Sequence, residues 1–188
     1  MKPSRMFLLI FILSAFVSLN AQDQGDMMKK WQDYMTPGPN HQLLTKMVGE
    51  WKGEITNFQG GQEMKAEGVA KYEMILGGRY LESSFSASMM GMPMEGFGLD
   101  AYDNATKEFI SVWLDNMGTG VLVLKGTLDE KTRTITYLGS MVDPMTSKET
   151  KVKTVNTLVD DNKSVFDMYT IADGKEVKNM TVVYTRIK

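Results

Sequence analysis

Polar and apolar residues alternate with a period of two over most of the chain. Between residues 63 and 74, apolar or small side chains such as Met64 and Ala66 alternate with polar ones such as Lys65, and the run 80–89 repeats the pattern. Because successive side chains of a β-strand point to opposite faces, this alternation predicts strands with one buried and one solvated face. The larger part of the chain is therefore predicted to be all-β.

Clusters of Gly, Asp and Asn separate the alternating runs at regular intervals, and such residues favour tight turns. Short turns force neighbouring strands to pair antiparallel, and no helical period interrupts them. We therefore predict an antiparallel up-and-down barrel of about ten strands, because closure removes exposed strand edges. A sandwich of the same strands is the alternative. The turn signals are Gly60-Gly61, Gly77-Gly78, Asp103-Asn104, Asp129-Glu130-Lys131, Asp160-Asp161-Asn162 and Asp173-Gly174.

A helical period precedes the first strand, within residues 22–48. Apolar residues spaced by three and four predict a helix that begins near Asp23, and the Pro-Gly-Pro run at residues 37–39 ends it. Asn40 is a candidate cap for a second helical turn over residues 41–47. We expect both pieces to pack against one end of the barrel, and a partner-binding or membrane-surface helix is the alternative. The apolar positions of the first helix are Met27, Met28, Trp31, Tyr34 and Met35.

The first residues have the order expected of an export signal. Lys2 and Arg5 form a basic start, an apolar run over residues 6–17 follows, and small and polar residues lead to Ala21. The run is shorter than the roughly twenty residues that cross a membrane, so a cleavable signal peptide is predicted, with an uncleaved anchor as the alternative. We expect cleavage after Ala21 and an exported protein that starts at Gln22, in the periplasm or outside the cell.

Composition narrows the function classes. The chain has no cysteine, which excludes disulfides and thiol redox chemistry. Its formal net charge of −2 does not provide the basic surface that nucleic acid requires. No second long apolar run follows the first, so no membrane span is predicted. The expected organisation is a signal peptide at 1–21, a helical segment at 22–48 and a barrel domain at 49–188.

Two elements resemble the signature of lipocalins and fatty-acid-binding barrels. Gly49-Glu50-Trp51 opens the first strand after a short helical turn, and Arg186 lies near the end of the last strand. The resemblance implies that Trp51 closes one end of the barrel and that Arg186 lies across its ring. Such stacking gains cation–π energy, and the guanidinium keeps its hydrogen bonds to nearby carbonyls.

Short motifs follow one another along the chain in the order Pro37-Gly38-Pro39-Asn40-His41, Gly49-Glu50-Trp51, Leu76-Gly77-Gly78-Arg79-Tyr80-Leu81, Met90-Gly91-Met92-Pro93, Ala101-Tyr102-Asp103-Asn104, Trp113-Leu114-Asp115 and Tyr184-Thr185-Arg186. This order resembles a secreted bacterial family catalogued as domain of unknown function number fifteen-seventy-nine. The resemblance spans nearly the whole expected mature chain. It implies a lipocalin-like barrel and implies no activity.

His41 is the only histidine in the sequence, and it lies between the Pro-rich turn and the second helical turn. We interpret it as a structural residue whose imidazole fixes that turn to the barrel. Haem ligation and general-base catalysis are the alternatives, although no nucleophile and carboxylate accompany it nearby in sequence. No catalytic residue and no cofactor is therefore assigned.

Methionines cluster at the end of one predicted strand, at Met89, Met90, Met92 and Met94. Soft thioethers suit Cu(I), but Met also serves as a flexible apolar filler. We interpret the cluster as an apolar rim or lid of the barrel, with copper binding as the alternative, and we assign no metal site.

The predicted function is the binding of a small, mostly apolar molecule inside the barrel, because barrels of this size have room for one ligand. An enzyme that uses the same cavity and an envelope-associated interaction protein are the alternatives, and no partner protein is identified. The expected lining residues are Met64, Ala66, Tyr72, Phe85, Phe97, Trp113 and Tyr169.

Two further expectations concern the interior of the barrel. Small residues such as Ala66, Gly68 and Ala70 on one apolar strand face are expected to leave volume unfilled. The charged residues expected to face the cavity are Arg79, Glu82 and Asp115.

Overall fold

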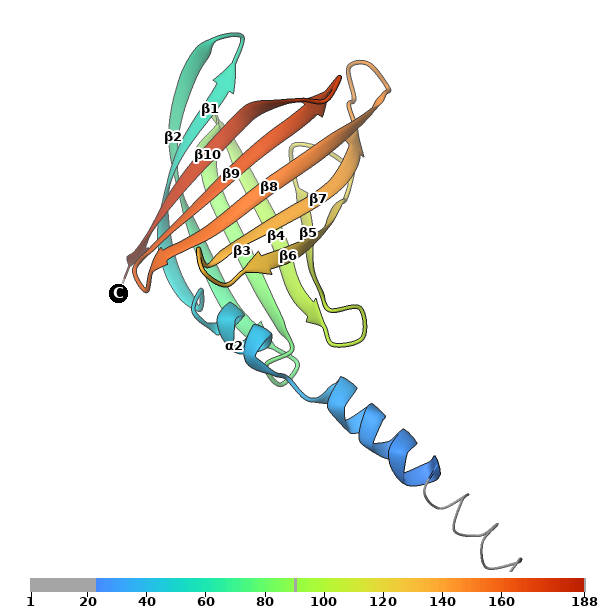
Figure 1. The fold of residues 1–188 in the computed structure, drawn as a ribbon. Coiled ribbons are helices and arrows are strands. Elements are labelled where there is room, and N and C mark those ends of the chain that lie inside the picture. The colour runs from blue at the N-terminus through green and yellow to red at the C-terminus, as the bar shows by residue number, and fades with distance from the viewer. Residues whose placement is uncertain (1–22, 90, 188) are drawn as a thin grey trace, which may run out of the picture. The chain divides into compact units, whose positions relative to one another are not determined.

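The chain folds into two helices and ten strands within residues 23–89 and 91–187, the part described by a computed structural model (Figure 1). One helix spans residues 23–35, and α2 spans Pro39–Thr45. The predicted signal peptide lies outside the described residues and stays a prediction. The strands are β1 (Gly49–Gln59), β2 (Gln62–Ile75), β3 (Tyr80–Met89), β4 (Met92–Asp103), β5 (Glu108–Asp115), β6 (Leu122–Asp129), β7 (Thr134–Val142), β8 (Glu149–Asp160), β9 (Lys163–Ala172) and β10 (Lys175–Ile187).

The ten strands close into one antiparallel barrel in which each strand pairs with its neighbours in sequence. β1 also pairs with β10, with Trp51 opposite Arg186 and Ile55 opposite Val182. This last pairing removes both edges of the sheet. The predicted all-β up-and-down barrel is therefore confirmed, and the alternative sandwich is wrong.

The chain divides into two units, Met1–Thr36 and Pro37–Lys188. In the described part of the first unit, the helix over residues 23–35 carries a Lys29–Asp33 ion pair with an Nζ–Oδ2 distance of 3.2 Å. The second unit contains α2 and the barrel. None of the described helices is both long enough and apolar enough to cross a membrane.

Alternation decides which side chains face the barrel interior. On β2, Ala70 is buried, whereas its neighbours Val69 and Lys71 are exposed. α2 lies across the barrel end at which β1 begins, and Leu44 of α2 joins the core there (Figure 1). Two groups of buried residues fill the interior. The first contains Leu44, Leu81, Phe109, Leu124, Ile135, Tyr137 and Val152, and the second contains Trp51, Ile55, Ala70, Phe85 and Val182.

Gly68 and Ala70 on the inner face do not leave the empty volume that the sequence led us to expect, whereas Ala66 lines a pocket. A Cβ added at Gly68 would lie 2.6 Å from the Phe85 ring, and a Cβ added at Gly96 would lie 2.3 Å from the Trp113 ring. The expectation at Gly68 is wrong because an aromatic ring from the next strand occupies the space of the missing side chain. Ala70 is also packed, with 1% of its surface exposed.

Candidate functional site

The end of the barrel at which β1 begins is closed by a stacked pair. The Arg186 guanidinium lies 4.2 Å from the centre of the Trp51 ring, and Trp51 is fully buried. Arg186 Nε, Nη1 and Nη2 donate hydrogen bonds to the carbonyls of Asp161, Val48 and Lys46 at 2.8, 2.5 and 2.5 Å. The structure thus brings the two signature residues together, and every nitrogen of this guanidinium donates a hydrogen bond to a backbone carbonyl.

His41 fixes α2 against the same end. The backbone N–H of Gly38 donates to His41 Nδ1 at 3.0 Å, and the imidazole lies edge-on to the Tyr102 ring of β4 with centroids 5.7 Å apart. Burial lowers the pKa of His41, a backbone hydrogen bond with Tyr102 opposes this shift, and the Arg79 charge adds to it. A buried, neutral imidazole with these contacts supports the structural interpretation of His41.

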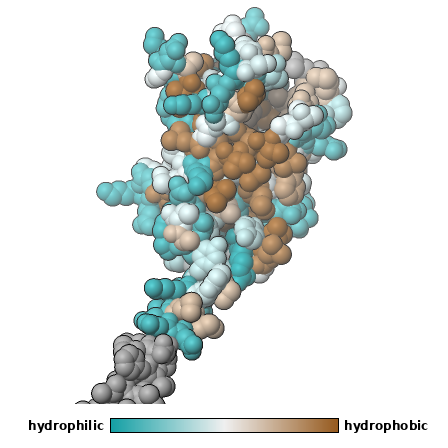
Figure 2. Space-filling view, turned by 90° about the vertical axis from the view of Figure 1, so that its right-hand side faces the viewer, coloured by the Kyte–Doolittle hydropathy of each residue, from teal (hydrophilic) through white to brown (hydrophobic). Residues whose placement is uncertain are grey.

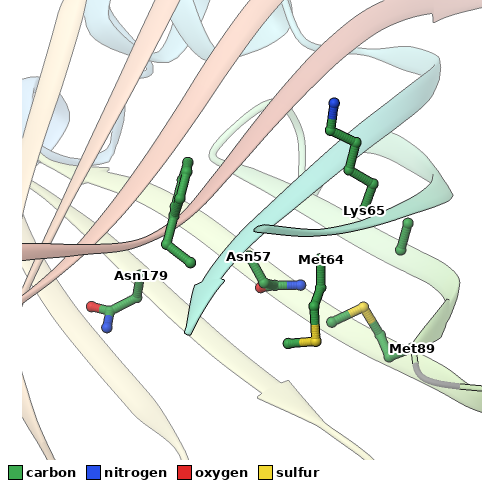
Figure 3. Close-up of a pocket in the computed structure, with 7 residues that line it drawn as sticks. Asn57, Met64, Lys65, Met89 and Asn179 are labelled. Atoms are coloured by element: carbon green, nitrogen blue, oxygen red, sulfur yellow. The ribbon is translucent and has the colours of Figure 1, made fainter. Parts of the chain in front are cut away.

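The end described so far is called the closed end below. The opposite end, called the open end, holds a pocket of about 490 Å³. Its walls come from β1, β2, β3 and β10 near the hairpins that join them to their neighbours. In Figure 3, Asn57, Met64 and Met89 lie together on one side of these strands, and Lys65 points away from them. The pocket is therefore mostly apolar and carries amide groups. Its lining residues are Asn57, Phe58, Met64, Lys65, Ala66, Met89 and Asn179.

Most of the predicted lining residues face the interior, but they divide between two places. Met64 and Ala66 line the pocket. Tyr72, Phe85 and Trp113 belong to or pack against the second buried group. These three aromatic residues fill the interior and do not line the pocket.

Phe97 and Tyr169 need correction, because both lie on the outer face of the barrel. Phe97 is 38% exposed. Tyr169 lies beneath Lys153 and Lys178, whose Nζ atoms are 4.7 and 5.3 Å from the centre of its ring. The neighbouring Met168 packs against the core, so alternation sends Tyr169 outward. The aromatic character of these two residues suggested that they are buried. Their positions in the alternation of their strands place both on the outer face instead.

Phe97 belongs to an outer apolar face on β4–β7 (Figure 2). Phe97 is paired with Leu114 and Val112 with Val123, so the face continues across neighbouring strands. An exposed apolar patch of this kind is typical of an interaction surface. The residues of the outer apolar face are Phe97, Leu99, Val112, Leu114, Val123 and Leu138.

Asp100 is a buried carboxylate that reasoning from the sequence missed. Ser111 of β5 hydrogen-bonds it, but Asp100 Oδ1 has no partner. Burial raises the pKa of Asp100 to about 6, against the opposing effect of the Ser111 hydrogen bond. Burial also raises the pKa of Tyr72, Tyr137 and Tyr184, that of Tyr184 to about 12, and the Asp100 charge adds to each shift. The interior therefore contains a carboxyl group that titrates near neutral pH.

Of the three charged residues expected at the cavity, Asp115 is the one that faces inward. Its Oδ2 accepts a hydrogen bond from Trp113 Nε1 at 2.8 Å, and its Oδ1 accepts one from the Met117 N–H at 2.9 Å. Arg79 lies in the exposed turn between β2 and β3, and Glu82 lies on the outer face of β3. Those two expectations are wrong, because a turn and strand parity direct both side chains outward.

The methionine cluster does not point to one centre. Met89 and Met94 pack against the second buried group, and Met89 also lines the pocket. Met92 is 47% exposed, and Met90 lies outside the described residues. This placement supports the interpretation of the cluster as an apolar rim. In the part of the chain that the structure describes, no three His, Cys, Asp or Glu side chains gather to hold a metal ion.

Sequence reasoning also missed the pocket amides, Asn57 and Asn179. Asn57 follows Ile55 on the inward side of β1. Asn179 lies where the pairing of β10 with β9 shifts between Lys178 and Met180. Such a bulge inserts one residue and re-aims its side chain, so the alternation that served elsewhere fails here. Asn179 Oδ1 is buried and has no hydrogen-bond partner.

Comparison with known proteins gives a family and a fold. Residues 36–186 match the model of a family described as "Protein of unknown function (DUF1579)". No curated protein matches the chain.

Among solved structures, the S-type phycobiliprotein lyase CPES from Guillardia theta has a similar fold. Its TM-score is 0.57 at 10% identity, covering 85% of this chain and 97% of that chain. A protein with unknown function from the DUF3598 family of Nostoc punctiforme is matched at a TM-score of 0.25 and 8% identity, covering 80% and 100%. At such identity, the likeness to the lyase shows the fold alone.

Proposed function

The chain belongs to the DUF1579 family, as the order of its motifs predicts, and we propose that it binds a small, mostly apolar molecule in the pocket at the open end of the barrel. The observation that carries this proposal is the pocket itself. Its volume of about 490 Å³ lies within the range of small-molecule sites, and Met64, Ala66 and Met89 give it apolar walls.

The expected affinity follows from the apolar surface that a ligand buries. Burial of about 300 Å² is worth roughly 7 kcal/mol at about 25 cal/mol per Å². A gain of about 7 kcal/mol alone corresponds to a dissociation constant of about 10 μM, and because association itself costs several kcal/mol, the expected binding is weaker than that. A ligand that binds the native state alone raises the melting temperature in a dose-dependent way.

The test is a thermal-shift titration with small apolar probes such as naphthalene derivatives. At least one probe should raise the melting temperature, and Ala66→Trp should remove the shift because the indole fills the pocket. Val69→Trp is the matched control, since Val69 lies on the same strand but on the outer face, 44% exposed. If no probe shifts the melt, or if both variants respond like the parent protein, the binding proposal fails.

We further propose that the barrel acts after export, in the periplasm or outside the cell. The basic, apolar and small-residue order of residues 1–21 supports this proposal. N-terminal sequencing of the protein from its own host should find Gln22 first. A soluble cytoplasmic form with Met1 intact would contradict it.

An enzyme that uses the barrel interior is the second candidate, and Asp100 is the observation that favours it. A carboxyl group with a pKa of about 6 is suited to exchanging protons near neutral pH. The test is to incubate a small-molecule extract of the host with the protein and with Asp100→Asn, and to compare the products by mass spectrometry. Turnover by the parent alone would establish the enzyme, and identical profiles would exclude a catalytic role for Asp100 on those compounds.

A further inference from the structure

We infer that the open end of the barrel binds an extended peptide, which adds a strand to the free edge of β2 and places apolar side chains over the pocket. This inference goes beyond the proposed binding of a small molecule, because it concerns the main chain of β2 beside the pocket. It follows from the point at which the pairing of β2 with β3 ends and from the residues that line the pocket.

β2 and β3 stop pairing before they reach the open end. Within the described residues, the register between them ends at Gly68 opposite Ala87. β2 continues to Gln62, and over this last stretch it pairs with β1. In Figure 1 the hairpin of β1 and β2 projects from this end of the barrel. Residues 62–67 therefore form a strand edge that has no register partner on β3.

The turn between β1 and β2 determines which backbone groups point toward β3. Gly60 and Gly61 both have positive φ, 59° and 79°, as in a two-residue hairpin turn whose flanking residues form a hydrogen-bonded pair. Hydrogen-bonded and non-hydrogen-bonded pairs then alternate along the two strands. Counted from Gln62, this alternation directs the backbone N–H and C=O groups of Glu63 and Lys65 away from β1. These groups face the gap beyond the end of the β2–β3 pairing.

The lining of the pocket indicates that the pocket reaches this edge. Met64 and Ala66 lie on the inner face of β2 and Lys65 lies on the outer face between them, yet all three line the pocket. A cavity enclosed by the barrel wall would meet inward residues alone, because successive side chains of a strand point to opposite faces. Met89 at the end of β3 lines the same pocket (Figure 3). The pocket therefore borders the gap between β2 and β3.

An extended peptide matches both the strand edge and the pocket. Its main chain exchanges hydrogen bonds with the free backbone groups of Glu63 and Lys65, which a hydrocarbon chain cannot do. Its alternate side chains then lie over Met64 and Ala66 at the apolar pocket. Opposite charges on neighbouring strands attract, so the preferred peptide carries an acidic residue opposite Lys65 and a basic residue opposite Glu63.

The test uses a fluorescein-labelled peptide of sequence Val-Glu-Val-Lys-Val, titrated into the full chain and followed by fluorescence anisotropy. In an antiparallel register its Glu meets Lys65 and its Lys meets Glu63. N-methylation of the Glu and Lys amides should weaken binding by about tenfold or more, because it removes the donors that face β2. N-methylation of the central Val is the matched control and should leave the affinity unchanged, since that N–H points away from β2. Equal effects of the two modifications, or no binding of the unmodified peptide, would overturn the inference.

Hydrogen exchange measured by NMR locates the added strand. In the free protein, the amides of Glu63 and Lys65 should exchange faster than those of Met64 and Ala66, which point toward β1. The bound peptide should slow exchange at Glu63 and Lys65. Binding that leaves exchange at these two amides unchanged would show that the peptide lies elsewhere, and the inference would be wrong.

Substitutions at Lys65 test the same edge from the side of the protein. Lys65→Pro removes the free N–H without removing a hydrogen bond between β1 and β2, and it should abolish peptide binding. Lys65→Ala keeps that N–H and should weaken binding by about threefold at most, from the lost charge pair. Equal binding by the two variants would contradict the inference. If Lys65→Pro does not fold, the N-methylated peptides decide the question on the parent protein.

The outcome is distinguishable from that of the small-molecule proposal. Apolar probes that shift the melt while the peptide does not bind would overturn the peptide inference alone. Peptide binding without a melting shift from any apolar probe would overturn the small-molecule proposal alone.

Discussion

The two ends of the barrel differ in how completely their polar groups are paired. At the closed end, Trp51 Nε1 donates to the Met47 carbonyl at 2.7 Å, and all three nitrogens of Arg186 donate to backbone carbonyls. At the open end, Asn179 Oδ1 is buried and has no hydrogen-bond partner. Complete pairing around a buried ring is what a stabilising closure requires. The polar groups of the open end are less completely paired, and this end holds the pocket.

The difference also separates two uses of apolar side chains. The rigid Trp51 ring is fully buried at the closed end. Unbranched Met64 and Met89 line the open end, where thioether chains adapt to irregular shapes. The contrast predicts that changes at the closed end act on stability and that changes at the open end act on ligand binding.

The largest effect should come from removing the buried ring. Trp51→Ala should lower the free energy of unfolding by about 3–5 kcal/mol, because it leaves a cavity and strips Arg186 of its stacking partner. Met64→Ala is the matched change at the half-buried open end and should cost about 1 kcal/mol. Urea denaturation measures both. Equal losses in the two variants would refute the contrast between the ends.

Asp100 should give the barrel a pH-dependent stability. Its pKa is about 6 in the folded protein against 3.8 as the ordinary value, so the folded state holds a proton that the unfolded chain has lost between these pH values. The contribution is therefore fully present below about pH 4 and is lost as pH rises to about 6, by up to about 3 kcal/mol. Asp100→Asn should flatten this part of the stability profile. A variant whose stability still falls as steeply over that range would show that other groups cause it.

The closed end should also depend on Arg186. Arg186→Ala should lower the free energy of unfolding by about 1–3 kcal/mol, from the loss of the cation–π contact and of hydrogen bonds. Arg186→Lys should recover part of this loss, since an ammonium keeps the charge but not the three-way fork of donors. An unchanged denaturation midpoint in Arg186→Ala would refute the role of this residue in closing the barrel.

The smallest effect is expected at the methionine rim. Replacing Met90, Met92 and Met94 together by Leu should change the free energy of unfolding by less than about 1.5 kcal/mol, because Leu keeps the volume and apolar character. We expect no specific Cu(I) binding in the parent protein. A tight Cu(I) site that the triple substitution abolishes would restore the copper alternative.

The sequence by itself determined the barrel and the identity of its closed end. Alternation along each strand and the Gly, Asp and Asn turns are local signals, and short turns leave antiparallel pairing as the outcome. Trp51 and Arg186 were identified through a resemblance to known barrels, and the pairing of β1 with β10 places these two residues opposite each other. The regular alternation along β2 also predicted that Met64 and Ala66 lie on the inner face.

The tertiary structure alone decided which inner positions are filled and which are open. Gly68 appeared to leave space, yet the Phe85 ring of the neighbouring strand occupies it. Asp100 is an ordinary acid in the sequence, and only closure of the barrel buries it and raises its pKa. Asn179 faces the pocket because a bulge shifts the pairing of β10 by one residue. Alternation assigns a side chain to one of two faces, but the occupation of the space beside it depends on strands that are distant in sequence.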